Sequence, residues 1–321
     1  MPPAMCEITV EPEGILLVDK PTGLTSHDVV QAVKRLLGVK KAGHLGTLDP
    51  MATGLLIICI GAATKAAQFM MDHIKEYEGT MMLGAQTDTW DADGKITAQC
   101  DFSSVTEGMV RDAFSSFTGD LELQAPAFSA IKQGGKPLYK KARSGEVVNP
   151  PIRKARVYNF DLLGFEPPKV KFRCSVSPGA YVRSLAVEVG KKLEVGAYLE
   201  ALRRTMSGPY RVEDAASLQK LEIEPDIGLI LEKLIPLKDA LGSIPELFLD
   251  WGITALVQNG GHISESELES GKAKLKGDKN GRLYKAINPH GKVVAIMELS
   301  DSKGVCEWKS VRVWEREVPE F

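Results

Sequence analysis

The sequence lacks the features that mark several classes of protein. Its 321 residues include five cysteines and five histidines with no CxxC or Cys-His cluster, so we expect neither a metal site nor a disulfide framework. The longest apolar run, residues 55–60, is far too short to cross a bilayer, so no membrane association is expected. Residues 1–14 have no basic segment followed by an apolar one, and this predicts a cytoplasmic protein without an export signal.

The net charge is also small, at -2, which argues against a protein that coats nucleic acid nonspecifically. The charge is nevertheless uneven along the chain. Eight basic residues between positions 132 and 156 face the single acid Glu146: Lys132, Lys136, Lys140, Lys141, Arg143, Arg153, Lys154 and Arg156. Such a run is usually a solvated surface. Here Pro137, Tyr139 and two glycines give a bent segment with a stacking ring, which suits a phosphate backbone and an unpaired base.

Hydrophobic periodicity predicts a mixed α/β (α+β) fold with a central, largely antiparallel sheet flanked by helices. We expect strands at residues 14–19, 55–60, 76–83, 155–163 and 169–176. We expect helices at residues 26–37, 63–71, 107–116, 180–193 and 197–204. Ser26 is the expected cap of the first helix, and Gly38 is expected to end it. The elements do not alternate regularly, and no internal repeat is visible, which disfavours a doubly wound sheet.

A second, smaller domain is predicted at residues 245–321. It follows an acidic stretch with three prolines, and its expected strands at 285–287, 293–298 and 311–314 are separated by Gly- and Asn-rich turns. We therefore place the first domain at residues 1–240 and expect the second to be β-rich.

The stretch GHLGTLDPMATG has the layout of a chemical site, because Asp49 is a lone carboxylate in a glycine-punctuated loop beside His44. The following proline holds Asp49 out of any helix, while Gly43, Gly46 and Gly54 are expected to let another backbone approach closely. The alternative is an ordinary Asp-Pro turn, since turns recruit the same residues for geometry alone.

Three further side chains stand out. Tyr77 opens a predicted strand, where its ring could face a cleft, although a half-buried core tyrosine is the ordinary alternative. Tyr181 and Arg183 fall in the first turn of a predicted helix. The dipole is positive there, so Arg183 indicates an anionic partner nearby, against the alternative of an exposed arginine.

Together these segments resemble the TruB family of pseudouridine synthases. The strings GILLVDKPTGLTSHDVV, GHLGTLDPMATGLL, KEYEG with LGAQTDTWDADG, PAFSAIK, SPGAYVRSLA and YLEALRRTMSGPY follow the family's order across residues 13–211. The resemblance implies that Asp49 is the catalytic nucleophile, that His44 contacts the region of the displaced nucleotide, and that Tyr77 stacks on the target uracil.

The resemblance also assigns the rest of the pocket. It implies that Tyr181 and Arg183 line the pocket, with Arg183 paired to the nucleophile. It also implies that Leu202, the apolar residue before the paired arginines, lines the pocket, and that Lys20 and Pro21 support the site. One departure is that Glu78-Gly79 follows the strand tyrosine instead of a β-branched pair.

The implied activity is the isomerisation of uridine 55 in the T-loop of tRNA by a monomer that needs no obligate protein partner. The basic insertion, about residues 124–154, is then an RNA clamp with phosphate contacts from Lys132, Lys136, Lys140, Lys141, Arg143 and Arg153. The second domain would be a PUA-like RNA-binding domain, although no specific string supports it. Two alternatives are a non-catalytic tRNA-binding or folding module and a guide-RNA-dependent synthase; we see no basic tail of the kind the latter carries.

The implied chemistry requires no cofactor, because it breaks one C–N bond and makes one C–C bond without oxidation or an external group donor. Asp49 must be ionised, yet burial raises the pKa of a carboxyl group, and a guanidinium from Arg183 would resolve this conflict. The sequence leaves open whether Asp49 attacks the base, attacks the sugar or removes a sugar proton. It also leaves open whether Tyr77 or a water takes the C5 proton.

Overall fold

The structure is a computed structural model that describes residues 12–223, 225–276, 281–302 and 305–314. Predictions for the two ends of the chain therefore lie outside the described residues. None of the helices within these ranges has the length and apolar character needed to cross a bilayer.

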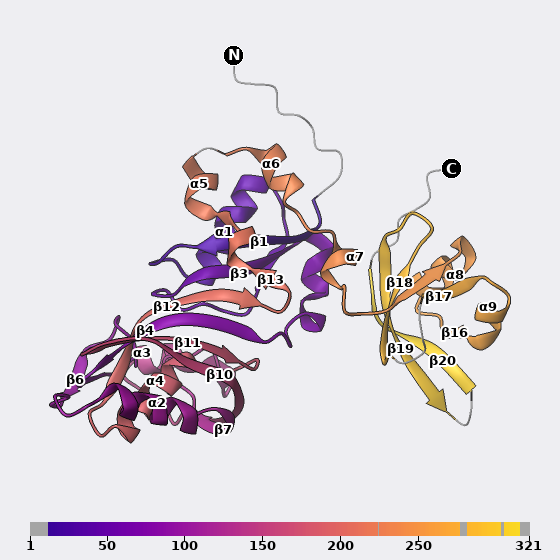
Figure 1. Cartoon of the computed structure of the whole chain (residues 1–321). Helices are drawn as coiled ribbons and strands as arrows, with labels where there is room; N and C mark the ends of the chain where they lie inside the picture. Colours follow the sequence, from indigo (N-terminus) through magenta and orange to yellow (C-terminus); the bar gives the residue numbers. More distant parts are fainter. Residues whose placement is uncertain (1–11, 224, 277–280, 303–304, 315–321) are drawn as a thin grey trace, which may run out of the picture.

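A ten-stranded mixed sheet organises the first domain (Figure 1). Its main order is β14-β1-β3-β12-β4-β11-β10-β7, with β2 paired to β3 and β13 to β12. The β1–β14 and β3–β12 pairs are parallel and the other described pairs are antiparallel, which confirms the predicted sheet. The strands are β1 (Gly14–Lys20), β2 (Ala42–Leu45), β3 (Thr53–Ile60), β4 (Lys75–Leu83), β7 (Gly119–Gln124), β10 (Ile152–Glu166), β11 (Lys169–Val176), β12 (Ala197–Ser207), β13 (Tyr210–Arg211) and β14 (Ala216–Ser217).

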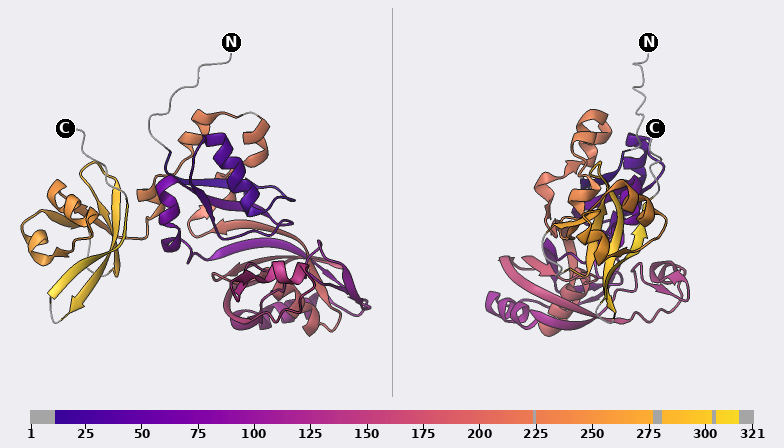
Figure 2. Two further views of the ribbon diagram at one scale, coloured as in Figure 1. Left: turned by 180° about the vertical axis from the view of Figure 1, so that it is seen from behind. Right: turned by 90° about the vertical axis from the view of Figure 1, so that its right-hand side faces the viewer.

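Helices and short hairpins cover the two halves of this sheet (Figures 1 and 2). The α2–α4 pair packs on the β12-β4-β11-β10 half, whereas α1 and α5 pack beside β1 and β2. The bounds are α1 (Ser26–Leu37), α2 (Glu107–Ser116), α3 (Leu138–Arg143), α4 (Val182–Lys192), α5 (Leu218–Ile223), α6 (Ile227–Glu232) and α7 (Leu237–Ala240), with hairpins β5–β6 (Ala85–Thr87, Ile96–Gln99) and β8–β9 (Lys132–Gln133, Lys136–Pro137) and the 3₁₀ turn η3 (Val212–Asp214).

Helix α1 confirms the predicted span and its Gly38 end, where φ is +64°, but the predicted cap is wrong. Thr25 caps the helix: its hydroxyl accepts from the Asp28 amide at 3.1 Å, and the Asp28 carboxylate accepts from the Thr25 amide at 2.9 Å. Ser26 instead points into the protein, where its hydroxyl accepts from the Leu48 amide at 2.8 Å and donates to the Leu48 carbonyl at 3.1 Å.

Two predicted helices are wrong. Residues 61–69 form the 3₁₀ turns η1 (Gly61–Lys65) and η2 (Ala67–Phe69) instead of an α-helix. Residues 197–207 form strand β12, which lies between β3 and β4 in the middle of the sheet. The Leu- and Ala-rich segment has good helix propensity, but pairing on both edges satisfies its backbone and outweighs that local preference.

The second domain is β-rich, as predicted. Its six-stranded sheet has the order β16-β20-β19-β18-β15-β17 and encloses its own apolar core around Tyr284 and Trp308. The predicted strands correspond to the larger elements β18, β19 and β20. The bounds are β15 (Glu246–Leu249), α8 (Trp251–Gln258), β16 (Ile263–Ser264), α9 (Glu265–Glu269), β17 (Ala273–Lys276), β18 (Leu283–Ile287), β19 (Val293–Ser302) and β20 (Val305–Val313).

The two domains are in contact at η1, which contains Ala62. Trp314, directly after β20, donates from its indole nitrogen to the carbonyl of Ala62 at 2.9 Å. Val293 and Ile296 of the second domain join an apolar cluster with Ile15 of β1. The junction is therefore packed rather than a free linker.

Candidate active site

The loop that carries Asp49 joins β2 to β3, and its shape depends on two glycines. At Gly54, φ is +98° and an added Cβ would lie 2.3 Å from the Arg204 carbonyl oxygen. Gly46 has φ of +72°, and an added Cβ would lie 3.3 Å from Nη1 of Arg204. The expectation for Gly43 is wrong, because nothing lies within 4 Å of its Cβ position. Gly54 therefore lets β3 meet β12 just after the loop.

The buried side chains of Lys20 and Ser26 hold this loop to the rest of the domain. Nζ of the fully buried Lys20 donates to the carbonyls of Pro21 at 2.9 Å, Pro50 at 3.2 Å and Ala52 at 2.6 Å. Burial lowers the pKa of Lys20 to about 8, and the Asp49 charge opposes this shift. Ser26 holds the Leu48 backbone from the first turn of α1. The residues on both sides of Asp49 are thus fixed to the core.

Asp49 and Arg183 form an ion pair. Nη2 of Arg183 donates to Oδ1 of Asp49 at 3.0 Å, and Nε lies 2.9 Å from Oδ2. The Arg183 side chain is 4 % exposed and that of Asp49 is 32 % exposed. Arg183 lies in the first turn of α4, and Tyr181 is the residue before the helix rather than part of its first turn. The arginine thus meets the anionic partner that its position indicated.

A second carboxylate, which the sequence did not single out, contacts the same guanidinium. Oδ2 of Asp91 lies 3.2 Å from Nη1 of Arg183, and the Asp91 side chain is 6 % exposed. Thr89 donates to Oδ1 of Asp91 at 2.5 Å, and the Thr89 carbonyl accepts from Nη1 of Arg183 at 3.0 Å. Burial raises the pKa of Asp91, while the Thr89 hydrogen bond and Arg183 act in the opposite direction.

The two carboxylates differ in access. The Asp91 side chain is enclosed at 6 % exposure, whereas the Asp49 side chain retains exposed surface. Because LGAQTDTWDADG contains three aspartates, the string alone gave no reason to choose the second. The choice follows from the docking of this loop, in which the Ala92 amide donates to the Leu199 carbonyl of β12 at 3.0 Å.

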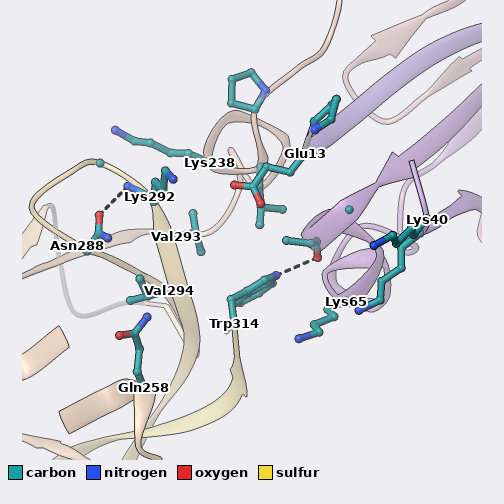
Figure 3. A pocket seen from close by; sticks show the side chains of 17 residues that line it. Glu13, Lys40, Lys65, Lys238, Gln258, Asn288, Lys292, Val293, Val294 and Trp314 are labelled. Carbon is teal, nitrogen blue, oxygen red and sulfur yellow. Dashed lines mark hydrogen bonds between the residues drawn. The ribbon is translucent and has the colours of Figure 1, made fainter. Parts of the chain in front are cut away.

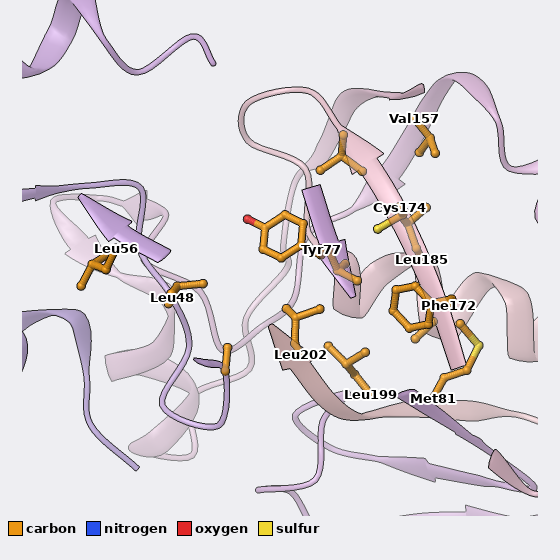
Figure 4. Close-up of a cluster of buried hydrophobic side chains, with 14 of the residues drawn as sticks. Leu48, Leu56, Tyr77, Met81, Val157, Phe172, Cys174, Leu185, Leu199 and Leu202 are labelled. Carbon is orange, nitrogen blue, oxygen red and sulfur yellow. The ribbon is translucent and has the colours of Figure 1, made fainter. Parts of the chain in front are cut away.

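Tyr77 and Leu202 belong to the same buried apolar cluster as Leu48, the residue before Asp49. Tyr77 of β4 and Leu202 of β12 come from neighbouring strands and are each 7 % exposed. Figure 4 shows the Tyr77 ring above Leu202, with its hydroxyl directed toward the side where Leu48 lies. Tyr77 is thus a buried core residue in the cluster that also contains Leu48 of the Asp49 loop, and its stacking role stays a prediction.

His44 and Tyr181 contribute polar groups around the same loop. His44 lies on β2, and its buried Nδ1 has no hydrogen-bond partner within the described residues. Burial lowers the pKa of His44, with a further contribution from Arg204, so the neutral ring is favoured. Burial raises the pKa of Tyr181, which keeps its hydroxyl protonated.

Arg204 is a second buried charge that the sequence did not single out as a site residue. It is 1 % exposed, and it donates from Nε to the Leu55 carbonyl at 2.6 Å and from Nη2 to the Gly46 carbonyl at 3.1 Å. These bonds tie the start of β3 and the Asp49 loop to β12. Its only sequence signal was its place after Leu202 in the paired arginines.

The basic insertion is folded in the structure. It contains the β8–β9 hairpin and α3, and the fully buried Leu138 anchors it, with its amide donating to the Ile131 carbonyl at 2.8 Å. At the root of the insertion, the Phe128 carbonyl accepts from Nη2 of Arg183 at 3.0 Å. The expected phosphate-contacting residues Lys132, Lys136, Lys140, Arg143 and Arg153 are exposed, and Lys141 is half-buried.

The described residues contain no group of three or more histidine, cysteine, aspartate or glutamate side chains placed to hold a metal ion. The side chains at the site offer carboxylate, guanidinium, ammonium, imidazole and phenol groups. These groups can provide a nucleophile, a charge partner and an aromatic platform.

Comparison with known proteins identifies the family of the chain. The family model described as "TruB family pseudouridylate synthase (N terminal domain)" matches residues 34–182, and the "tRNA pseudouridylate synthase B C-terminal domain" model matches residues 183–232. The chain is 38% identical over 265 residues to tRNA pseudouridine synthase B of Xanthomonas oryzae, covering 82% of this chain and 86% of the relative. The chain belongs to the TruB family.

Other TruB relatives give the same result. The synthase of Geobacillus kaustophilus is 42% identical over 255 residues, covering 77% of this chain and 90% of the relative. The synthase of Opitutus terrae is 46% identical over 234 residues, covering 73% of this chain and 97% of the relative. Among solved structures, an archaeal box H/ACA Nop10-Cbf5 complex matches with a TM-score of 0.68 and 25% identity, covering 98% of this chain and 90% of that chain.

Proposed function

We propose that this TruB-family protein converts uridine to pseudouridine in tRNA, at position 55 of the T-loop, with Asp49 as the nucleophile acting on a flipped-out nucleotide. The observation that carries the proposal is the Asp49–Arg183 pair, with Tyr77 and Leu202 on the neighbouring strands β4 and β12. The substrate class is supported by curated relatives named tRNA pseudouridine synthase B, at 38% to 46% identity.

Each group has a chemical task in this reaction. The N1–C1′ bond breaks, the C5–C1′ bond forms, C5 loses a proton and N1 gains one, so no oxidant or group donor takes part. Arg183 pairs with Asp49 through two contacts and so holds the carboxylate in one orientation for attack. Stacking on the ring of Tyr77 is worth about 1–3 kcal/mol, which offsets part of the cost of flipping the nucleotide.

Asp91 acts as a positioning residue in this proposal. Its carboxylate lies 3.2 Å from Nη1 of the Arg183 guanidinium. The Thr89 and Phe128 carbonyls accept hydrogen bonds from Nη1 and Nη2 of the same guanidinium. The guanidinium therefore has little freedom to rotate away from Asp49. We propose that His44, half-buried on β2 with an Nδ1 that has no partner among the described residues, contacts the region of the displaced nucleotide.

The basic insertion is proposed to clamp the RNA stem by phosphate contacts. Substituting Lys140, Lys141 and Arg143 by glutamine should lower the slope of log affinity against log salt by about three, one for each phosphate contact. A slope equal to that of the wild type would contradict the clamp. We further propose that the second domain is PUA-like and binds RNA, and that the protein acts in the cytoplasm as a monomer.

Guide-independent action is the part of the proposal that separates it from the alternative of a guide-RNA-dependent synthase. The test incubates the pure protein with an unmodified tRNA transcript and maps pseudouridine by position. Product at position 55 without added RNA or protein supports stand-alone action. Product that appears only after a guide RNA is added would overturn it, and tight binding without any product would support the non-catalytic module.

A further inference from the structure

A cleft of about 570 Å³ lies where the two domains meet, outside the Asp49 site (Figure 3). Its walls come from the chain before β1, the β2 and η1 region, α7 and the start of β19. The Trp314–Ala62 hydrogen bond crosses between the two walls at one end of the cleft. The size falls within the roughly 300–1,000 Å³ range of small-ligand pockets.

The charge of the cleft is strongly one-sided. Among the described residues that line the cleft, Glu13 is the single acid. Five lysines line it: Lys40, Lys41, Lys65, Lys238 and Lys292. Figure 3 shows Lys40 and Lys65 on the first-domain side, with Lys238 and Lys292 on the facing side. Lys238 is paired with Glu246 at 3.7 Å, whereas Lys40 and Lys41 place two like charges at the same cavity, and an anion there would relieve their repulsion.

Two observations point to a ligand rather than to an ordinary solvated surface. Neither the Lys40 nor the Lys41 side chain has a hydrogen bond or ion pair with any residue that the structure describes, although carboxylates pair with many other basic side chains of the protein. Asn288 also lines the cleft, although it is 3 % exposed, and its side-chain oxygen is already used by the Lys292 amide at 2.9 Å. Its amide group can therefore supply a buried donor beside the lysines.

We propose that this interdomain cleft is a phosphate-binding site. Lysine ammonium groups bind phosphate as compact point charges, and lysines from both domains would contact one bound group, which would tie the domains together. The walls offer no exposed aromatic face, since Trp314 is 5 % exposed, so recognition is by phosphate and not by a base.

The cleft is remote from the catalytic carboxylate. Strand β3 runs from Thr53, beside the Asp49 loop, to Ile60, next to the cleft residue Gly61. Eight extended residues span roughly 25 Å. Two sources of phosphate fit this position: the backbone of a tRNA whose T-loop occupies the Asp49 site, which rests on the proposed function, and a free polyphosphate.

The test compares the triple variant Lys40→Gln, Lys41→Gln, Lys292→Gln with a matched control, Lys192→Gln, Lys220→Gln, Lys272→Gln. The control lysines are exposed, are not among the cleft residues, and likewise include two from the first domain and one from the second. Affinity for full-length tRNA is measured across a salt series, and binding of inorganic tripolyphosphate is measured by calorimetry. Neither readout needs turnover, so failure here is distinct from failure of the proposed activity.

If the phosphate comes from tRNA, the cleft variant binds tRNA about tenfold more weakly than the control, its salt slope falls by two to three, and tripolyphosphate competes with tRNA. If the phosphate is free, the cleft variant loses tripolyphosphate binding at least tenfold while its tRNA affinity matches the control. The proposal is overturned if the cleft variant and the control agree in both titrations.

Discussion

Replacing Arg183 by methionine is the perturbation that the site geometry predicts in most detail. The change keeps most of the side-chain volume but removes the contacts at 2.9 and 3.0 Å to Asp49 and at 3.2 Å to Asp91. Removing one partner of a buried ion pair costs about 3–5 kcal/mol, because the other charge stays buried. The matched control is Arg173→Met, whose partner Glu78 lies 2.6 Å away in a pair whose side chains are 46 % and 40 % exposed. Such a surface pair is worth about 0–1 kcal/mol.

Urea unfolding followed by circular dichroism measures both variants, with the slope of the transition checked for two-state behaviour. Adding Asp91→Asn to Arg183→Met should recover part of the lost stability, because it removes one of the two carboxylates left without a partner. A loss below 1 kcal/mol for Arg183→Met, or no recovery in the double variant, would refute the buried network.

The pH dependence gives a second check on the same variant. Arg183 holds the pKa of Asp91 down against burial, so the folded-state pKa of Asp91 rises further from its ordinary 3.8 when Arg183 is lost. Above pH 3.8 the folded state then holds a proton that the unfolded state has released. Stability therefore falls as pH rises through this range. The deficit of Arg183→Met should be larger at pH 7 than at pH 4.

Three further predictions concern the loop, its lysine anchor and the pocket wall. Gly54→Ala should lower the free energy of unfolding by at least about 2 kcal/mol and reduce turnover, because the added Cβ would lie 2.3 Å from the Arg204 carbonyl oxygen. In the control Gly43→Ala, the free energy of unfolding should stay within about 0.5 kcal/mol of the wild type. Equal melting temperatures for the two variants would contradict this prediction. The pKa of Lys20 is about 8 in the folded state and 10.5 in the unfolded state, so between these pH values the unfolded state binds more protons. The free energy of unfolding of the wild type, relative to that of Lys20→Met, should therefore rise by roughly 3 kcal/mol from pH 8 to 10.5. Denaturant titrations measure this difference, and a fall over the same pH range would contradict the prediction. Tyr77→Leu should weaken binding of the T-arm RNA by about 1–3 kcal/mol while Tyr77→Phe keeps it, and equal losses in a binding titration would argue against stacking.

The sequence predicted the parts of the fold that rest on local pattern. The span of α1 follows from its apolar face and Gly38, and the limits of β1, β4 and β11 follow from segments rich in β-branched or alternating apolar residues. It failed for residues 197–204, where Leu199, Ala201 and Leu202 favour a helix locally but pairing with β3 and β4 imposes a strand. The cap of α1 was missed because both Thr25 and Ser26 suit the position, and only the tertiary bond to Leu48 decides between them.

The site was predictable as a set of segments but not as a network. The motif strings located Asp49, Tyr77, Arg183 and Leu202, which the structure brings to neighbouring loops and strands. Asp91 could not be chosen, because its burial depends on a loop that docks on β12 more than a hundred residues later. The interdomain lysine cleft was equally invisible, since its residues come from seven separate parts of the chain.

The measurement that tests the central claim most directly is a single-turnover assay of pseudouridine formation with enzyme in excess over tRNA, for the wild type and Asp49→Asn. The substitution keeps the shape of the side chain and removes its charge, and tRNA binding is titrated in parallel. We predict complete conversion by the wild type and, for Asp49→Asn, unchanged binding with a rate at least a thousandfold lower, about 4 kcal/mol in barrier. Conversion by Asp49→Asn at a rate within tenfold of the wild type would show that the carboxylate is not the reacting group.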